Sequence, residues 1–278
     1  MGVDGGYTQR DVQELARILT GFGINLKADA KPRAGKWQSQ YIHRGLFEFN
    51  PNRHDYGDKQ FLGKTIKGRG PAELDEALDM LAQHPATARF VSKKLAMYFV
   101  GDHPSAALTE RMAQTFLQSD GNITSTLRTL FGSPEFTRSL GHQFKDPQHY
   151  IFSVMRLAYD NQPILNTTPV LNWLSRLGQP RFGKLTPDGY PLTAQAWDSP
   201  GQMTTRFEIA KTIASGSPGL FKSDAGIEKA AFPKLANALY FEYLQSTLSP
   251  NTLRSLDQAG SPQEWNTLFL AAPEMMMK

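Results

Sequence analysis

The residue types best suited to chemistry gather in one short stretch, FEFNPNRHDYGDKQFLG, which spans residues 47 to 63. Its middle contains one imidazole and several side chains with oxygen atoms: Asn50, Asn52, His54, Asp55 and Asp58. A histidine beside a carboxylate can help to hold a divalent cation, or can act as a general base. His54 and Asp55 are therefore the candidate catalytic residues, and His54, Asp55 and Asp58 are the candidate metal ligands.

The same stretch also has the composition of a wide polar turn. Asn, Asp and Gly make the local hydrogen bonds with the backbone that such a turn requires. The spacing of the acidic residues matches no calcium-binding loop. The residues alone leave both interpretations open, a functional site and a structural turn.

Several common catalytic and cofactor-binding motifs are absent from the sequence. The segment GDKQFLGKT, Gly57 to Thr65, has five residues between its glycines. A phosphate-binding loop needs four, followed directly by a helix, and IKGRGP cannot form that helix. The chain has no cysteine, which excludes disulfides, thiolate nucleophiles and cysteine-bound metals.

Positive charge is concentrated around the same stretch. Residues 27 to 69 hold ten Lys or Arg against four Asp or Glu, a net charge of +6, although the whole chain carries only +4. Aromatic residues are interleaved with these cations, a mixture that suits an anionic polymer. It also suits an ordinary strand surface in which lysine protects the edge. Lys59 and Lys64 are the candidate polymer contacts. Nucleic acid is the less favoured polymer.

Apolar periodicity predicts a mostly helical chain. Thr8 and Asp11 resemble a capping box at the start of a first helix, which ends near Gly21. Later helices are predicted at 71–84, 85–101, 104–121, 122–136, 147–159, 169–177, 201–214, 225–247 and, as a final pair, 250–276. Two β-rich pieces, 43–49 and 59–67, predict one hairpin joined by the polar loop. The predicted fold is mainly α: a single domain over residues 1–278, a helical bundle with a small β-hairpin excursion near residues 40–67.

A long loop rich in glycine and proline is predicted at residues 178–200. Long loops in compact domains are often functional. Asp188, Tyr190 and Trp197 are its candidate binding residues. Two interpretations stay open here: the aromatic side chains pin the loop onto the bundle, or they line the mouth of a site for an extended ligand.

With these segments in hand, the chain resembles the uncharacterised bacterial "domain of unknown function 1800" family. The matching segments run in family order over nearly the whole chain: GVDGGYTQRDVQELARILTGF, FEFNPNRHDYGDKQFLG, ALDMLAQHPATARFVSKKLAMYFVGD, LRTLFGSPEF, LGQPRFGKLTPDGYPLTAQAWDSP and FLAAPEMMMK. The His-Asp pair, here His54-Asp55, is a recurrent family feature. So is the Pro-Asp-Gly-aromatic-Pro segment, in which this chain has Tyr190 where the family more often has Trp.

The resemblance implies no particular activity, but it implies a setting. Family members are usually longer, so the chain corresponds to the C-terminal part of the family domain and an upstream helical region is expected. Members are often exported and often encoded beside a sulfatase-like family, domain of unknown function 1501. A periplasmic or exported location is expected if an upstream signal precedes Met1, since the chain itself starts without a signal-peptide pattern and has no transmembrane segment.

We therefore predict an accessory or binding protein of the bacterial cell envelope, which acts with a partner protein or an anionic polymer. The alternative is a metal-assisted hydrolase or lyase centred on His54 and Asp55, with a divalent cation as its cofactor. An enzyme would bring these two residues into a pocket with a distant polar residue such as Asp188, Asp198 or Arg206. A binding protein would use them to satisfy the backbone of the polar loop.

Overall fold

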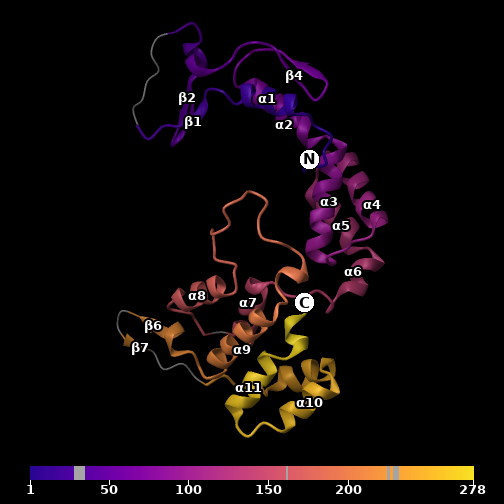
Figure 1. Ribbon diagram of the computed structural model, residues 1–278, viewed down its shortest axis with the longest axis vertical. Coiled ribbons are helices and arrows are strands. Elements are labelled where there is room, and N and C mark those ends of the chain that lie inside the picture. Colours follow the sequence, from indigo (N-terminus) through magenta and orange to yellow (C-terminus); the bar gives the residue numbers. More distant parts are fainter. Residues whose placement is uncertain (28–34, 161, 224–225, 228–231) are drawn as a thin grey trace. The chain divides into compact units, whose positions relative to one another are not determined.

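The computed structural model describes residues 1–27, 35–160, 162–223, 226–227 and 232–278 (Figure 1). The chain forms two compact units, which are described separately. The N-terminal unit contains residues 1–96 and 105–133, and the C-terminal unit contains residues 97–104 and 134–278. The single domain predicted from the sequence spans both units and stays a prediction.

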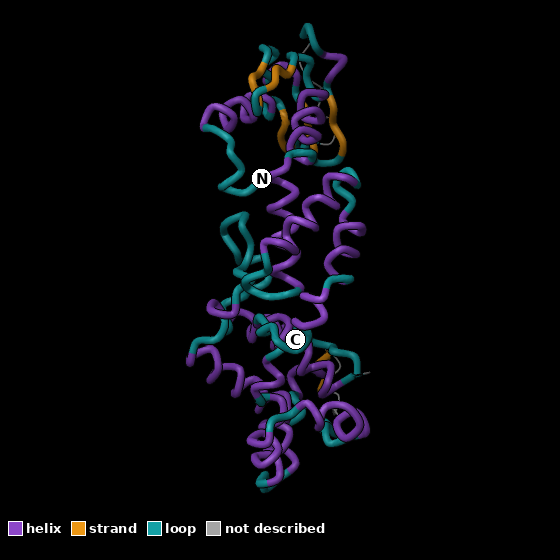
Figure 2. Tube along the Cα trace, turned by 90° about the vertical axis from the view of Figure 1, so that its right-hand side faces the viewer, coloured by secondary structure: helices purple, strands orange, loops and turns teal. Residues whose placement is uncertain are grey.

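The mainly α fold is confirmed, and the strands are few and short (Figure 2). The helices of the N-terminal unit are α1 (Gln9–Ile18), α2 (Ala72–Ala82), α3 (Pro85–Phe99, which continues into the C-terminal unit), α4 (Ala106–Gln118) and α5 (Ile123–Phe131). Its strands are β1 (Phe22–Ile24), β2 (Ile42–Arg44), β3 (Phe47–Phe49), β4 (Lys59–Phe61) and β5 (Lys64–Ile66).

The two predicted β-rich pieces do not pair with each other. Each makes its own antiparallel hairpin, β2 with β3 and β4 with β5, and β1 joins the first hairpin to give a sheet of order β1-β3-β2. The cause lies in the tight turns. Leu62 and Gly63 both have positive φ, as a two-residue type I′ turn requires, and Gly45 has positive φ in the other turn. Each strand therefore finds its partner after only two residues.

The capping box predicted at Thr8 and Asp11 is confirmed. The Asp11 carboxylate accepts hydrogen bonds from the Thr8 backbone N–H at 2.7 Å and from its hydroxyl at 2.6 Å. Its other oxygen accepts the backbone N–H of Leu62 at 2.7 Å, in the turn between β4 and β5. One carboxylate therefore starts α1 and fixes the second hairpin. Beneath it, Ile18, Phe61 and Ile66 form a buried core with α2.

The C-terminal unit is built from helices around α9. Its helices are α6 (Pro134–Ser139), α7 (Pro147–Tyr159), α8 (Thr168–Arg176), α9 (Pro200–Ala214), α10 (Pro250–Asp257) and α11 (Pro262–Leu270), and its strands are β6 (Lys222–Ser223) and β7 (Gly226–Ile227). α9 packs against α7 and α11. Residues 143–145 pair antiparallel with residues 276–278, which joins the beginning of this unit to its end.

Two helix predictions need correction. The predicted helix 122–136 is broken at Gly132, and Pro134 starts the separate helix α6. The predicted helix 225–247 is not continuous: its described part is helical only over residues 238–247, where a π-helix at Tyr240–Leu244 is followed by a 3-10 helix at Gln245–Thr247. Residues 224–225 and 228–231 of that prediction lie outside the described residues. Pro233 lacks an N–H donor, and its carbonyl is held by the Asn266 amide at 2.8 Å, so a helix cannot run through it.

In the part of the chain that the structure describes, no helix combines the length and the apolar character needed to span a bilayer.

The shared role of Asp11 gives a first prediction. Thr8→Ala removes one cap and should lower the free energy of unfolding of the N-terminal unit by about 1 kcal/mol. Asp11→Ala also leaves the partly buried N–H of Leu62 without its acceptor and should lower that free energy by about 2 kcal/mol. Urea unfolding followed by circular dichroism measures both values. Gln9→Ala, an exposed change in the same turn, is the control and should have little effect. Equal costs for Thr8→Ala and Asp11→Ala would contradict the shared role.

Candidate functional site

The centre of the predicted catalytic stretch is a buried carboxylate that sequence reasoning did not single out. Glu73, in the first turn of α2, is fully buried. Its Oε1 atom accepts hydrogen bonds from His54 Nε2 at 3.0 Å and from the backbone N–H groups of Arg69 at 2.6 Å and Gly70 at 2.7 Å. Its Oε2 atom accepts from Lys59 Nζ. Burial raises the pKa of Glu73, but these hydrogen bonds outweigh burial and hold that pKa below its ordinary value.

His54 has no ring nitrogen left for a substrate or a metal. Its Nδ1 atom lies 2.7 Å from the backbone oxygen of Thr20, and its Nε2 atom faces Glu73. Both partners are acceptors, so the ring makes both hydrogen bonds only when both nitrogens carry a proton. The ring is also packed edge-on between Phe49 and Tyr56. The imidazole therefore ties the polar loop to the end of α1 and to α2.

Asp55 faces a different partner from His54. Its two carboxylate oxygens accept hydrogen bonds from the Arg17 guanidinium at 2.7 and 3.3 Å, and one of them also accepts the N–H of Gly57 at 2.8 Å. The hydrogen bond from Arg17 lowers the pKa of Asp55 to about 2. The backbone N–H of Asp55 donates to the Thr20 hydroxyl at 2.8 Å. Asp55 thus makes hydrogen bonds both within the polar loop and to the end of α1 and the turn that follows it.

The remaining predicted residues of this stretch are also separated. Asp58 is exposed and pairs with Lys67 at 2.6 Å. Lys59, a candidate polymer contact, is instead fully buried against Glu73, whereas Lys64 is exposed on β5. No group of three or more His, Asp or Glu side chains among the described residues is arranged to hold a metal ion.

The long loop uses its predicted aromatic residues to hold its own base. The Tyr190 hydroxyl donates to the backbone oxygen of Pro180 at 2.7 Å, and Trp197 Nε1 donates to that of Pro191 at 3.0 Å. Trp197 is buried, and the nearby backbone N–H of Ala194 donates to Asp102 at 2.8 Å. Asp188 is exposed near the tip of the loop, hydrogen-bonded to the Thr186 hydroxyl.

The tip of this loop, residues 181–185, was missed by the sequence analysis. Phe182 is 92% exposed and Leu185 is 99% exposed, and the exposed Arg181 and Lys184 stand beside them. The Arg181 guanidinium lies 5.1 Å from the centre of the Phe182 ring. The sequence signal that could have found the tip is RFGKL, two basic and two large apolar residues within a segment rich in glycine and proline.

A second polar arrangement was missed at the start of α7. Asp146 caps the helix and also accepts a hydrogen bond from His149 Nδ1 at 2.7 Å. His149 Nε2 lies 3.2 Å from the hydroxyl of Tyr98. In the neutral ring with its proton on Nδ1, facing Asp146, Nε2 accepts from that hydroxyl. The available signal was the Asp-x-x-His spacing of a helix cap.

The other distant candidates have separate places in the C-terminal unit. Arg206 is fully buried, with its guanidinium between the rings of Phe144 and Tyr150 and its Nη2 atom 2.7 Å from the backbone oxygen of Lys145. Burial lowers the pKa of Arg206 to about 10. Arg206 is thus a core residue of α9, whereas Asp198 is exposed ahead of that helix.

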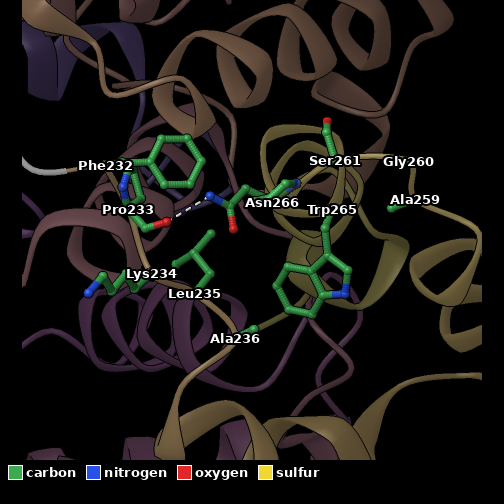
Figure 3. A pocket seen from close by; sticks show the side chains of 11 residues that line it. Phe232, Pro233, Lys234, Leu235, Ala236, Ala259, Gly260, Ser261, Trp265 and Asn266 are labelled. Carbon is green, nitrogen blue, oxygen red and sulfur yellow. Dashed lines mark hydrogen bonds between the residues drawn. The ribbon is translucent and has the colours of Figure 1, made fainter.

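A cavity of about 560 Å³ lies beside the start of α11. Figure 3 shows the rings of Phe232 and Trp265 lining it, with Asn266 hydrogen-bonded to Pro233. Lys234 is the single ionisable side chain among its described lining residues. The cavity therefore has the character of a binding site and lacks a pair of groups for acid–base chemistry.

The buried network around Glu73 makes a sharp prediction about stability. Glu73→Gln keeps the shape of the side chain but leaves the buried cation of Lys59 unpaired, so it should lower the free energy of unfolding by roughly 3–5 kcal/mol. His54→Ala should also destabilise the N-terminal unit. Urea unfolding is the measurement. Glu76→Gln is the control: Glu76 is also on α2 but is partly exposed, and it pairs with Arg69. This change should lower the free energy of unfolding by less than about 1 kcal/mol. A Glu73→Gln protein as stable as the Glu76→Gln protein would contradict the network.

The pairing of Asp55 with Arg17 predicts a pH dependence. Because the folded-state pKa of Asp55 is about 2, below the ordinary 3.8, its stabilising effect is complete above pH 4 and is lost as the pH falls towards 2. Asp55→Asn should therefore be less stable than the wild type near neutral pH, and the difference should shrink towards pH 2. Asp79→Asn is the control, because Asp79 lies on the exposed side of α2. It shows how the loss of one acidic charge alone changes stability with pH. A difference for Asp55→Asn that does not change with pH would refute the ion pair.

Comparison with known proteins identifies the family of this chain but no individual relative. No curated protein and no solved structure matches the chain. The family described as "Protein of unknown function (DUF1800)" matches residues 1–277, which confirms the resemblance found in the sequence. The chain therefore belongs to the DUF1800 family of proteins of unknown function.

Proposed function

We propose that this chain is an accessory protein of the bacterial cell envelope that binds a partner protein through the tip at residues 181–185. The single observation that carries the proposal is the exposure of Phe182 and Leu185 on a loop whose base is held in place. The location and the kind of partner, a sulfatase-like protein of the domain of unknown function 1501 family, rest on the family resemblance.

The backbone at the tip strengthens this proposal. The N–H of Gly183 donates to the backbone oxygen of Pro180 at 3.0 Å, which closes a turn with Phe182 at its third position. Phe182 has a φ of +58°, a region that favours glycine and costs other residues about 1–2 kcal/mol. Neither the turn nor the core gains from a phenylalanine here. A binding partner that covers the ring would explain its presence.

The chemistry of the tip favours a protein over an anionic polymer. Aromatic and arginine side chains, such as Phe182 and Arg181, are typical of the centres of protein interfaces. A polymer would need a row of free cations. In the basic stretch Lys59 is buried, and Lys67 and Arg69 are paired with carboxylates.

The alternative, a metal-assisted hydrolase or lyase, receives less support from the same contacts. It would require the ring of His54 to leave at least one of its two acceptors and Asp55 to leave Arg17. Each of these contacts is part of the network that holds the polar loop.

The tip can be tested with a single glycine substitution. Phe182→Gly removes the exposed ring and relieves the backbone, so the protein should be as stable as the wild type or more stable. Binding to the purified sulfatase-like protein, measured by isothermal titration calorimetry, should weaken at least about tenfold, since an aromatic anchor is worth roughly 2 kcal/mol or more. Arg181→Gln with Lys184→Gln should slow association and reduce its dependence on salt.

Leu26→Gly is the matched control, because Leu26 is 82% exposed but lies in the N-terminal unit. It should leave the affinity unchanged. The proposal fails if the wild type forms no complex, or if Phe182→Gly and Leu26→Gly bind equally well. Tight binding of polyphosphate that does not depend on Phe182 would favour the anionic polymer instead.

A further inference from the structure

A groove between α7 and α8 has walls that are mostly apolar, with Gln162, Thr167 and three charged residues among its lining. Its volume is about 470 Å³, within the roughly 300–1,000 Å³ typical of small-molecule sites. The apolar side chains that line it come from both helices and the segment between them: Phe152, Met155, Tyr159, Ile164, Val170, Leu171 and Leu174. This groove is separate from the cavity beside α11, and it shares one residue, Arg181, with the tip.

The walls present hydrocarbon to the groove. The hydroxyl of Tyr159 donates to the backbone oxygen of Ile213 at 2.7 Å, so this polar atom is already satisfied within the core. Phe152 and Leu171 remain 40% and 45% exposed, which leaves apolar surface that nothing in the described chain covers fully. An apolar ligand would gain free energy by covering it.

The edge of the groove carries charge. Arg156 and Arg181 line it, and neither forms an ion pair with a described residue. Arg176, on α8 but outside the groove, is instead paired with Glu208. Asp160 is the one carboxylate among the described lining residues, so the edge carries a net charge of +1. That charge matches a ligand head with a single negative charge.

We infer that the groove binds a straight-chain fatty acid, with the hydrocarbon tail between α7 and α8 and the carboxylate at Arg156 and Arg181. A linear tail fits a continuous apolar wall, and guanidinium groups bind carboxylates with two parallel hydrogen bonds. This inference goes beyond the proposed function, because it concerns a different ligand and a groove that shares only Arg181 with the tip, and it holds whether or not the tip binds a protein.

Decanoate, below its micelle concentration, is the probe, and isothermal titration calorimetry is the measurement. We expect saturable binding of one decanoate per chain, with 1-decanol, which has the same chain length and no charge, binding about tenfold more weakly. Arg156→Gln should reduce the affinity for decanoate to that for 1-decanol. Leu171→Trp should fill the groove and abolish binding of both.

Arg176→Gln is the matched control and should bind decanoate like the wild type. Arg156 is exposed, so its substitution tests the site even if Leu171→Trp fails to fold. The inference is overturned if wild-type protein shows no saturable binding, or if decanoate and 1-decanol bind equally. Tighter binding of dodecyl phosphate than of laurate, two probes of equal chain length, would overturn the carboxylate assignment. Phe182→Gly lies outside the groove lining, so its effect on the partner protein is read separately.

Discussion

The N-terminal unit depends on one buried carboxylate. Glu73 collects a lysine, a histidine and two backbone N–H groups in a place without solvent. Moving such charges out of water is costly, and only complete hydrogen bonding offsets that cost. The segments that supply the donors are therefore fixed relative to α2. The same network occupies both ring nitrogens of His54, with Thr20 on one side and Glu73 on the other.

Local features of this fold could be read from the sequence, and long-range ones could not. The capping box of Thr8 and Asp11 spans four residues and was predictable, as were most helix starts at proline or asparagine. The hydrogen bond between His54 and Glu73 joins residues 19 positions apart, and no spacing rule predicts it. The hairpins were mispaired because Leu62 takes a positive φ that leucine seldom adopts. The groove between α7 and α8 and the exposure of Phe182 depend on packing, which residue types alone do not specify.

The aromatic side chains of the long loop in the C-terminal unit have two different roles. Tyr190 and Trp197 hold the base of the long loop through hydrogen bonds to its backbone, while Phe182 at its tip is exposed. A tip on a fixed base loses little conformational entropy when a partner covers it. Binding in the groove between α7 and α8 should also cost little conformational entropy, since helices hold its walls in place.

The pairing of residues 143–145 with residues 276–278 has a consequence for how this unit can be connected. The backbone hydrogen bonds of Gln143 and Lys145 with Lys278 and Met276 bring an early and a late segment of one compact body together. Bodies of this kind tolerate insertion into other chains and circular permutation, because joining neighbouring ends strains nothing. A rearranged gene that opened the chain at the exposed 181–185 tip and linked residue 278 to residue 134 would keep every helix from α6 to α11.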